Sequence, residues 1–141
     1  MQVHDIMTTS VRTVTADSTV QDVAKKMDDE NVGALPVCDG ERLIGLVTDR
    51  DIVIRSTSAG QDPAKTSVRD VMTAPVTYAI EDQTIEEVAE VMKDQAIRRM
   101  PVLDRAHHLV GMLSVDDLML GPQRTAVDVV QAVTDVERPG L

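Results

Sequence analysis

The sequence predicts an α/β (α+β) fold in which two β-α-β-β-α repeats pack about a pseudo-twofold axis, followed by a C-terminal helix. The main observation is a duplication. Residues 3–39 align with 68–104 at a constant offset of 65, and 14 of the 37 paired positions are identical. After one extra residue the register resumes at 66, which pairs 45–51 with 111–117. A repeat of this length is a whole supersecondary unit, and two such units predict a pair of equivalent clefts.

Composition narrows the class of protein. With 141 residues the chain has room for one ordinary domain, whereas each copy alone would be marginal. A net charge of −10 argues against nucleic-acid or anionic-membrane partners, which require a basic surface. The single cysteine, Cys38, fits a reducing cytosol, and no apolar run is long enough to span a bilayer. We therefore expect a cytoplasmic protein with neither kind of partner.

Each element is predicted twice. A short strand is expected at 13–14 and again at 78–79. Apolar residues at i, i+3, i+4 and i+7 then predict an amphipathic helix over 19–30, with a capping box at Thr19, and an equivalent helix that begins at Thr84.

A hairpin follows each helix. Its strands are expected at 34–38 and 43–47 in the first copy, and at 100–103 and 109–113 in the second. Short helices are expected over 51–56 and 117–120. Ala126, Val127, Val130, Val133 and Val136 then predict the apolar face of a last helix. The expected organisation is a first repeat over 1–57, a linker over 58–66, a second repeat over 67–121 and a helical tail over 122–141.

The repeated pattern D-[IV]-M-T, then V-A-x-x-M, then P-V, then G-[LM]-[VL]-[TS]-x-x-D resembles tandem cystathionine-β-synthase (CBS) domains over about residues 1–121. The resemblance implies repeats that pair through their sheets, modules that form homodimers, and clefts that bind adenine nucleotides. The chain is also similar to small actinobacterial stress-associated proteins that consist only of a CBS pair.

The sharpest candidate site residues are Thr48 and Asp51. A strand delivers Thr48 to a helix start, where free backbone N–H groups favour an anion, and Asp51 can accept hydrogen bonds from two ribose hydroxyls. By the same match, the resemblance implies ligand contacts for Ser114 and Asp117. Thr48-x-x-Asp51 is also a good capping box, so helix capping alone explains these residue types. Both roles can hold together.

The copies differ at the entrance to the first hairpin strand. The second copy has Arg98 and Arg99, which suit phosphate groups, where the first has Gly33 and Ala34, which leave room for an adenine ring. An ion pair with a nearby carboxylate is the alternative role for the arginines. The two clefts are therefore predicted to bind unequally.

The remaining candidates follow from the resemblance or from the length of an arginine side chain that can reach a phosphate. Thr13-Val14 and Tyr78-Ala79 lie where the family packs the base, with strand packing as the alternative. Arg50 and Arg55 can reach a phosphate, with a solvated charge on the helix surface as the alternative role. The complete set of candidate nucleotide-binding residues is Thr13, Val14, Gly33, Ala34, Leu35, Thr48, Arg50, Asp51, Tyr78, Arg98, Arg99, Met100, Ser114 and Asp117.

No set of residues supplies a nucleophile, an oriented base and an oxyanion site together, so no catalysis is expected. The first hypothesis is a regulatory module that binds AMP, ADP or ATP between its repeats and signals to an unknown protein partner. No cofactor is required, and S-adenosylmethionine ranks behind the nucleotides. The alternative is a stress-associated interaction protein with empty clefts or another ligand. His107-His108 is interpreted as a plain turn rather than a metal site, and Cys38 as a buried packing residue rather than an intersubunit redox thiol.

Overall fold

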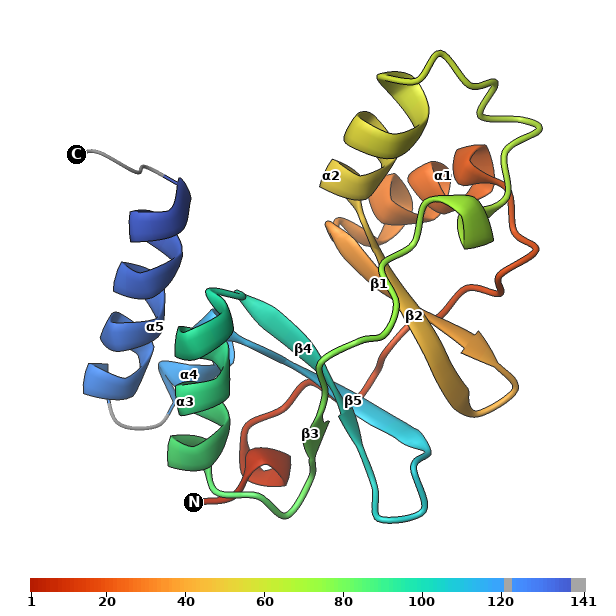
Figure 1. The fold of residues 1–141 in the computed structure, drawn as a ribbon. Coiled ribbons are helices and arrows are strands. Elements are labelled where there is room, and N and C mark those ends of the chain that lie inside the picture. The colour runs from red at the N-terminus through yellow and green to blue at the C-terminus, as the bar shows by residue number, and fades with distance from the viewer. Residues whose placement is uncertain (121–122, 138–141) are drawn as a thin grey trace. The chain divides into compact units, whose positions relative to one another are not determined.

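The structure, a computed structural model, describes residues 1–120 and 123–137 and divides into two compact units. One unit contains Met1–Val11 together with the chain from Thr77 onward, and the other contains Arg12–Val76. Figure 1 shows helices and strands in both units, which confirms the predicted mixture of the two. Each unit is described by itself below.

The unit Arg12–Val76 consists of an amphipathic helix on a two-stranded antiparallel sheet. Helix α1 (Val20–Glu30) begins after Thr19, whose hydroxyl accepts the Asp22 N–H, and ends at Asn31 in the left-handed conformation. The sheet contains β1 (Ala34–Asp39) and β2 (Arg42–Thr48). A short helix, α2 (Asp49–Asp51), and a π-helix, η2 (Ile52–Thr57), follow, and η3 (Val68–Asp70) lies beyond the connector. The core side chains are aliphatic: Val14, Ala16, Val20, Val23, Met27, Leu35, Val37, Val47, Val68 and Val71.

The unit that contains the second copy has the same plan with one more strand. It opens with η1 (Val3–Asp5), and its sheet has the order β3 (Ala79–Ile80), β4 (Arg99–Leu103), β5 (Leu109–Ser114). Helix α3 (Ile85–Gln95) begins after Thr84, and α4 (Val115–Leu118) follows β5. The final helix is α5 (Gln123–Glu137), which packs on α3 and α4. This arrangement matches the predicted α+β repeats with a helical tail.

The first strand of the first copy is shorter than predicted. Val14 forms a single parallel bridge to Val37, whereas the second copy forms β3 and continues the ladder with a Glu81 N–H to Leu103 C=O bond. Thr15 is exposed but its counterpart Ile80 is half-buried. The first copy therefore gains less from burying apolar surface at this edge.

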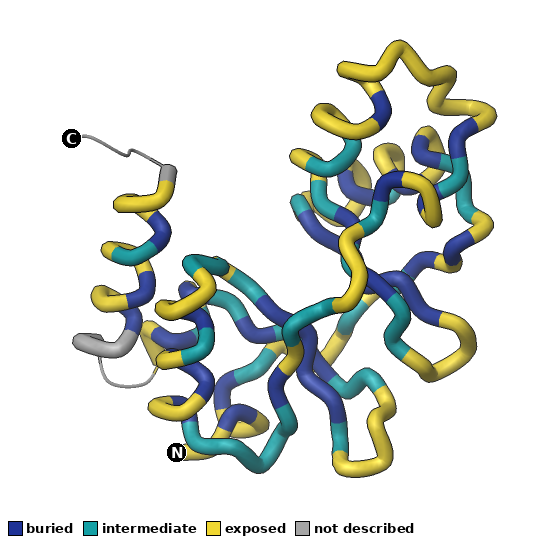
Figure 2. Tube along the Cα trace, in the orientation of Figure 1, coloured by how far each residue is buried: buried dark blue, intermediate teal, exposed yellow. Residues whose placement is uncertain are grey.

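Two further predictions need correction. Both short helices begin two residues early, at Asp49 and Val115, because Thr48 and Ser114 are their N-caps, and the first then continues as a π-helix. In α5 the buried stripe is Ala126, Val129 and Val133, so the predicted face was wrong at Val127, Val130 and Val136, which are exposed. Figure 2 shows this alternation of buried and exposed residues along α5.

The copies exchange their opening segments. Met7 and Thr8 of the first copy belong to the unit of the second, where Thr8 and Met112 exchange two backbone hydrogen bonds of 2.9 Å. Reciprocally, Thr73 of the second copy exchanges bonds of 2.8 and 3.0 Å with Leu46 of the first. The unit boundaries after Val11 and Val76 fall at equivalent positions of the repeat.

Glycine makes this close approach feasible. A Cβ added to Gly45 would lie 2.5 Å from the Met72 sulfur and 3.3 Å from the Thr73 carbonyl oxygen. The equivalent Cβ at Gly111 would lie 2.7 Å from the Met7 sulfur and 2.9 Å from the Thr8 carbonyl oxygen. Each glycine therefore admits the opening segment of the other copy against its sheet strand. None of the described helices is long and apolar enough to cross a membrane.

Candidate ligand site in each repeat

Thr48 and Asp51 form a reciprocal capping box at the end of β2. The Asp51 N–H donates to Thr48 Oγ1 at 3.0 Å, and the Thr48 N–H donates to Asp51 Oδ2 at 3.0 Å. The Asp51 side chain is 12% exposed. This geometry confirms the capping role, because both polar groups are satisfied locally. A ligand can bind only to the polar groups of this segment that the capping box leaves without a partner.

The backbone N–H groups at this helix start are not available to an anion. The Asp49 N–H donates to the Gly33 carbonyl at 2.9 Å, the Arg50 N–H donates to Asp49 Oδ1 at 2.9 Å, and the Asp51 N–H is taken by Thr48. The expectation of free donors there was wrong. The cause is local: the turn into α2 and the capping box together satisfy every donor of this three-residue helix.

The second carboxylate oxygen of Asp51 has a different environment. Its neighbours are Thr73 Oγ1 at 3.4 Å and Arg55 Nη1 at 3.7 Å, both longer than an ordinary hydrogen bond to oxygen. Among the described residues, Oδ1 therefore has no short hydrogen bond. A carboxylate oxygen has two acceptor sites, so it can still receive a hydroxyl from a ligand.

The second copy repeats this geometry. The Asp117 N–H donates to Ser114 Oγ at 3.2 Å, and the Ser114 N–H donates to Asp117 Oδ2 at 2.9 Å. The Thr8 hydroxyl lies 3.5 Å from Asp117 Oδ1. Both copies thus present one loosely held carboxylate oxygen beside a hydroxyl from the exchanged segment.

The entrances of strands β1 and β4 lie next to these capping boxes. Ala34 is the ladder partner of Thr48, and Arg99 is the partner of Ser114. In the second copy the Val115 N–H donates to the Arg98 carbonyl at 2.9 Å, which mirrors the bond to Gly33. The structure thereby brings the polar pair and the strand entrance together within each unit.

The two arginines are available for an anion. Arg98 is exposed and Arg99 half-buried, and neither forms an ion pair with a carboxylate of the described residues. The ion-pair alternative is thus not seen in this part of the chain. Arg50 is likewise exposed, next to Asp51 on α2. The strand entrance of the second repeat therefore has two arginines where that of the first has the uncharged Gly33 and Ala34.

Leu35 and Met100 lie inside the cores, at 2% and 0% exposure. Their side chains pack against apolar neighbours, so only their backbone is left to face a ligand.

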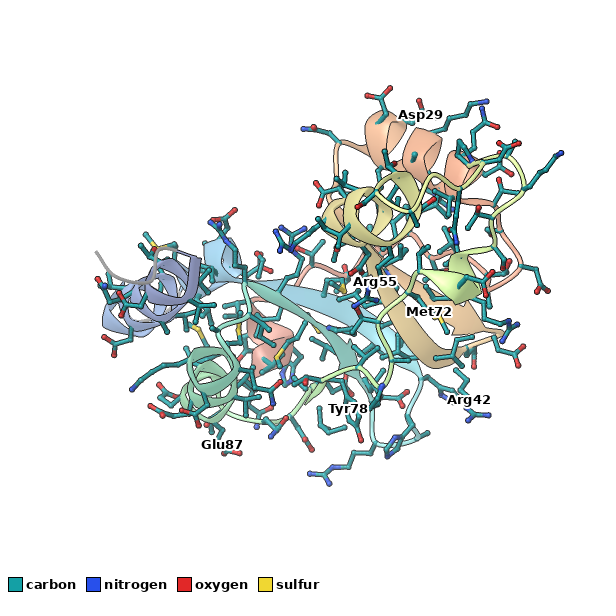
Figure 3. All side chains as sticks on the ribbon, turned by 45° about the horizontal axis from the view of Figure 1, so that its top comes forward. Asp29, Arg42, Arg55, Met72, Tyr78 and Glu87 are labelled. Atoms are coloured by element: carbon teal, nitrogen blue, oxygen red, sulfur yellow. The ribbon has the colours of Figure 1, made fainter. Side chains whose placement is uncertain are left out.

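Tyr78 is 42% exposed and its ring meets His107 edge-on, with centroids 5.8 Å apart. Figure 3 shows Tyr78 at the surface.

Thr13 and Val14 line a cavity of about 440 Å³ beside α1. Lys26 Nζ donates to the Thr13 carbonyl at 2.8 Å and forms part of its wall. The remaining lining residues are Thr15, Ser18, Asp22, Val23, Cys38 and Gly40. Asp22 and Lys26 were not among the predicted site residues, although their i, i+4 spacing on the polar face of the helix could have indicated that they share one side.

Cys38 is 5% exposed, in agreement with its predicted packing role, and burial raises the pKa of its thiol.

The turn at His107-His108 is held by local interactions. The His108 N–H donates to Asp104 Oδ1 at 2.9 Å, and His107 adopts a φ of 66°. Within residues 1–120 and 123–137, no cluster of three or more His, Cys, Asp or Glu could hold a metal ion.

Fold and repeated site together define a module of paired CBS domains, and the chain belongs to the CBS domain family, which it matches over residues 3–57 and 68–121. It is 34% identical to the CBS domain-containing protein YhcV of Bacillus subtilis over 99% of this chain and 97% of that protein. It is 35% identical to hypoxic response protein 1 of Mycobacterium tuberculosis over 92% of each chain.

Solved structures with the same fold carry different ligands. A crystal structure of hypoxic response protein I has two coordinated zinc ions (TM-score 0.79, 34% identity, 86% of this chain and 99% of that chain). CBSX2 was crystallised in complex with AMP (0.71, 25%, 97% and 98%). The CBS domain pair of MJ0100 was crystallised with 5′-methylthioadenosine and S-adenosyl-L-methionine (0.73, 27%, 85% and 94%).

Proposed function

We propose that this protein is a non-catalytic regulatory CBS-pair module that binds an adenine nucleotide at each repeat and signals energy or stress state to a protein partner. The observation that carries the proposal is the loosely held Oδ1 of Asp51 and Asp117. A ribose presents adjacent hydroxyl donors, and a carboxylate is their natural acceptor. The AMP complex of CBSX2 supports this class of ligand.

The two sites are proposed to differ in preference. Arg98 and Arg99 add two cations next to Ser114 that form no ion pair with the described residues, so a nucleotide with more phosphate charge should favour the second repeat. Gly33 and Ala34 add no charge next to Thr48, so the first repeat should tolerate an uncharged or cationic 5′ group. S-adenosylmethionine, which has a sulfonium in place of phosphate, is therefore the second candidate ligand, and the MJ0100 complex supports it.

The output of the module is proposed to go to a partner in trans from a cytoplasmic homodimer. Val53 and Ile54 are more than half exposed, and so are Met119 and Leu120 at the equivalent positions of the second copy. Repetition of one exposed apolar pair supports self-association, which analytical ultracentrifugation can measure. A ligand can signal only if it binds two states of this assembly with different affinity.

The experiment that tests the proposed function is calorimetric titration and thermal shift with AMP, ADP, ATP and S-adenosylmethionine. A ligand that binds only the native state raises the free energy of unfolding by about 2.7 kcal/mol when its concentration is a hundred times Kd. Asp51→Asn and Asp117→Asn keep an acceptor for the capping N–H but remove the charge, so each should weaken one site without unfolding the protein. Asp49→Asn, an exposed neighbour, is the matched control. If no ligand at millimolar concentration changes the unfolding temperature, the proposed function is wrong.

A further inference from the structure

The exchanged segment of the second copy reaches the candidate site of the first through Arg55. A single nitrogen, Arg55 Nη1, lies 2.9 Å from the Val71 carbonyl, 3.0 Å from the Met72 carbonyl and 3.3 Å from Thr73 Oγ1. The same nitrogen lies 3.7 Å from Asp51 Oδ1. Figure 3 shows Arg55 and Met72 next to one another.

Arg55 Nη1 has fewer hydrogens than nearby acceptors, so the acceptors share its hydrogen bonds. Nη1 has two hydrogens, yet four acceptors surround it within 3.7 Å. The Thr73 hydroxyl also lies 3.4 Å from both oxygens of Asp51. The carboxylate, the guanidinium and the hydroxyl therefore form one network, and a change in any partner alters the hydrogen bonds open to the others.

We propose that Arg55 and Thr73 are positioning residues that hold the Asp51 carboxylate for a hydroxyl-bearing ligand, and that ligand binding at the first repeat is thereby coupled to attachment of the segment Val68–Thr73. The proposal rests on the function given above, since the ligand is the nucleotide assigned to Asp51. A ligand that binds best when Asp51 is held in place must, by reciprocity, strengthen attachment of the segment that holds it.

The second repeat provides an internal control. Thr8 occupies the position equivalent to Thr73 and lies 3.5 Å from Asp117 Oδ1. In the aligned sequence the position equivalent to Arg55 is Gly121, which has no side chain to contribute. Arg55 therefore acts on the first site alone, and the amides of Thr8 and Met112 report on a segment that it does not touch.

The first experiment needs no ligand. Amide hydrogen exchange is measured by NMR at Leu46 and Thr73, whose N–H groups bond across the segment, and at Thr8 and Met112 in the other unit. Asp51→Asn removes the charge 3.7 Å from Arg55, and Arg55→Lys removes the guanidinium that bonds the Val71 and Met72 carbonyls. Each should raise exchange at Leu46 and Thr73 by about threefold to tenfold, the size of one ordinary hydrogen bond, and leave Thr8 and Met112 unchanged. Asp49→Asn is the control. Unchanged exchange at Leu46 and Thr73 in both variants overturns the network.

The second experiment adds AMP. In the wild type, AMP should slow exchange at Leu46 and Thr73. Thr73→Val should weaken AMP at one site by about threefold to tenfold, and Thr73→Ser, which restores the hydroxyl, should bind like wild type. A merely structural role would lower the unfolding temperature of Thr73→Val but leave its affinity unchanged, and that result overturns the positioning role. If wild type binds no AMP while Asp51→Asn still loosens the segment, the proposed function and the ligand half of this inference fail together and the structural network stands.

Discussion

Replacing each sheet glycine by alanine should destabilise the protein unequally. At Gly45 the new Cβ meets first the Met72 sulfur, at 2.5 Å, which lies on a flexible side chain that can turn away, while the Thr73 carbonyl oxygen is 3.3 Å distant. At Gly111 the new Cβ meets the Thr8 carbonyl oxygen at 2.9 Å. That oxygen is fixed, because it accepts the Met112 N–H at 2.9 Å, so backbone must move and a ladder bond must stretch.

The magnitudes follow from these contacts. Overpacking that only displaces a side chain should cost about 1 kcal/mol, and overpacking that shifts backbone about 2–3 kcal/mol. At about 2.1 cal/mol/K per residue, the unfolding entropy of 141 residues is about 0.3 kcal/mol/K. Gly45→Ala should therefore lower the unfolding temperature by about 3 °C and Gly111→Ala by about 7–10 °C.

Calorimetry and urea unfolding of the two variants provide the measurement. A double-mutant cycle separates the causes, since Met72→Ala should relieve Gly45→Ala, whereas Met7→Ala should relieve Gly111→Ala only in part. If Gly45→Ala costs as much as Gly111→Ala or more, the assignment of cost to the rigid carbonyl oxygen is refuted.

Two further predictions concern titration and reactivity. The backbone N–H of His108 donates to Asp104 and lowers the pKa of that carboxyl below its ordinary value. The ionised Asp104 carboxylate therefore stabilises the fold above the ordinary carboxyl pKa, and this stabilisation is lost as pH falls through the lowered pKa. Asp104→Asn should thus lower the free energy of urea unfolding more at pH 7 than at pH 3. Equal losses at the two pH values would contradict this. Because burial raises the pKa of the Cys38 thiol, the native protein at pH 8 should react with a disulfide reagent far more slowly than the urea-unfolded chain, and equal rates would show that the thiol is accessible.

The elements fixed by local chemistry were predictable from the sequence. Helices α1 and α3 begin directly after Thr19 and Thr84, because a strong apolar period coincides with a capping residue. The capping box at Thr48 was also predicted, whereas at Thr19 only half of the predicted box forms, with the Asp22 N–H donating to Thr19 Oγ1. The apolar face of α5 was not, because the run Ala126–Val133 contains enough valines to satisfy two helical registers.

The exchange of opening segments could not be predicted for a different reason. Both copies carry a methionine and a threonine in the opening segment and a glycine in the second hairpin strand, so Met7 fits the site of Met72 and the reverse. Local sequence gives no preference between packing on its own copy and on the other. The Arg55 network depends on this tertiary choice, so the sequence did not indicate it.

The exchange also sets an order of events during protein synthesis. Residues 12–76 are contiguous, so their unit is complete as soon as Val76 has left the ribosome. Residues 1–11 are made first but belong with the chain from Thr77 onward, and Thr8 finds Asp117 only after more than a hundred further residues. At about 5–20 residues per second, that is a delay of roughly 5–20 s. Until the second copy has been made, the apolar side chains of Val3, Ile6 and Met7 lack the core cluster against which they pack in the folded unit.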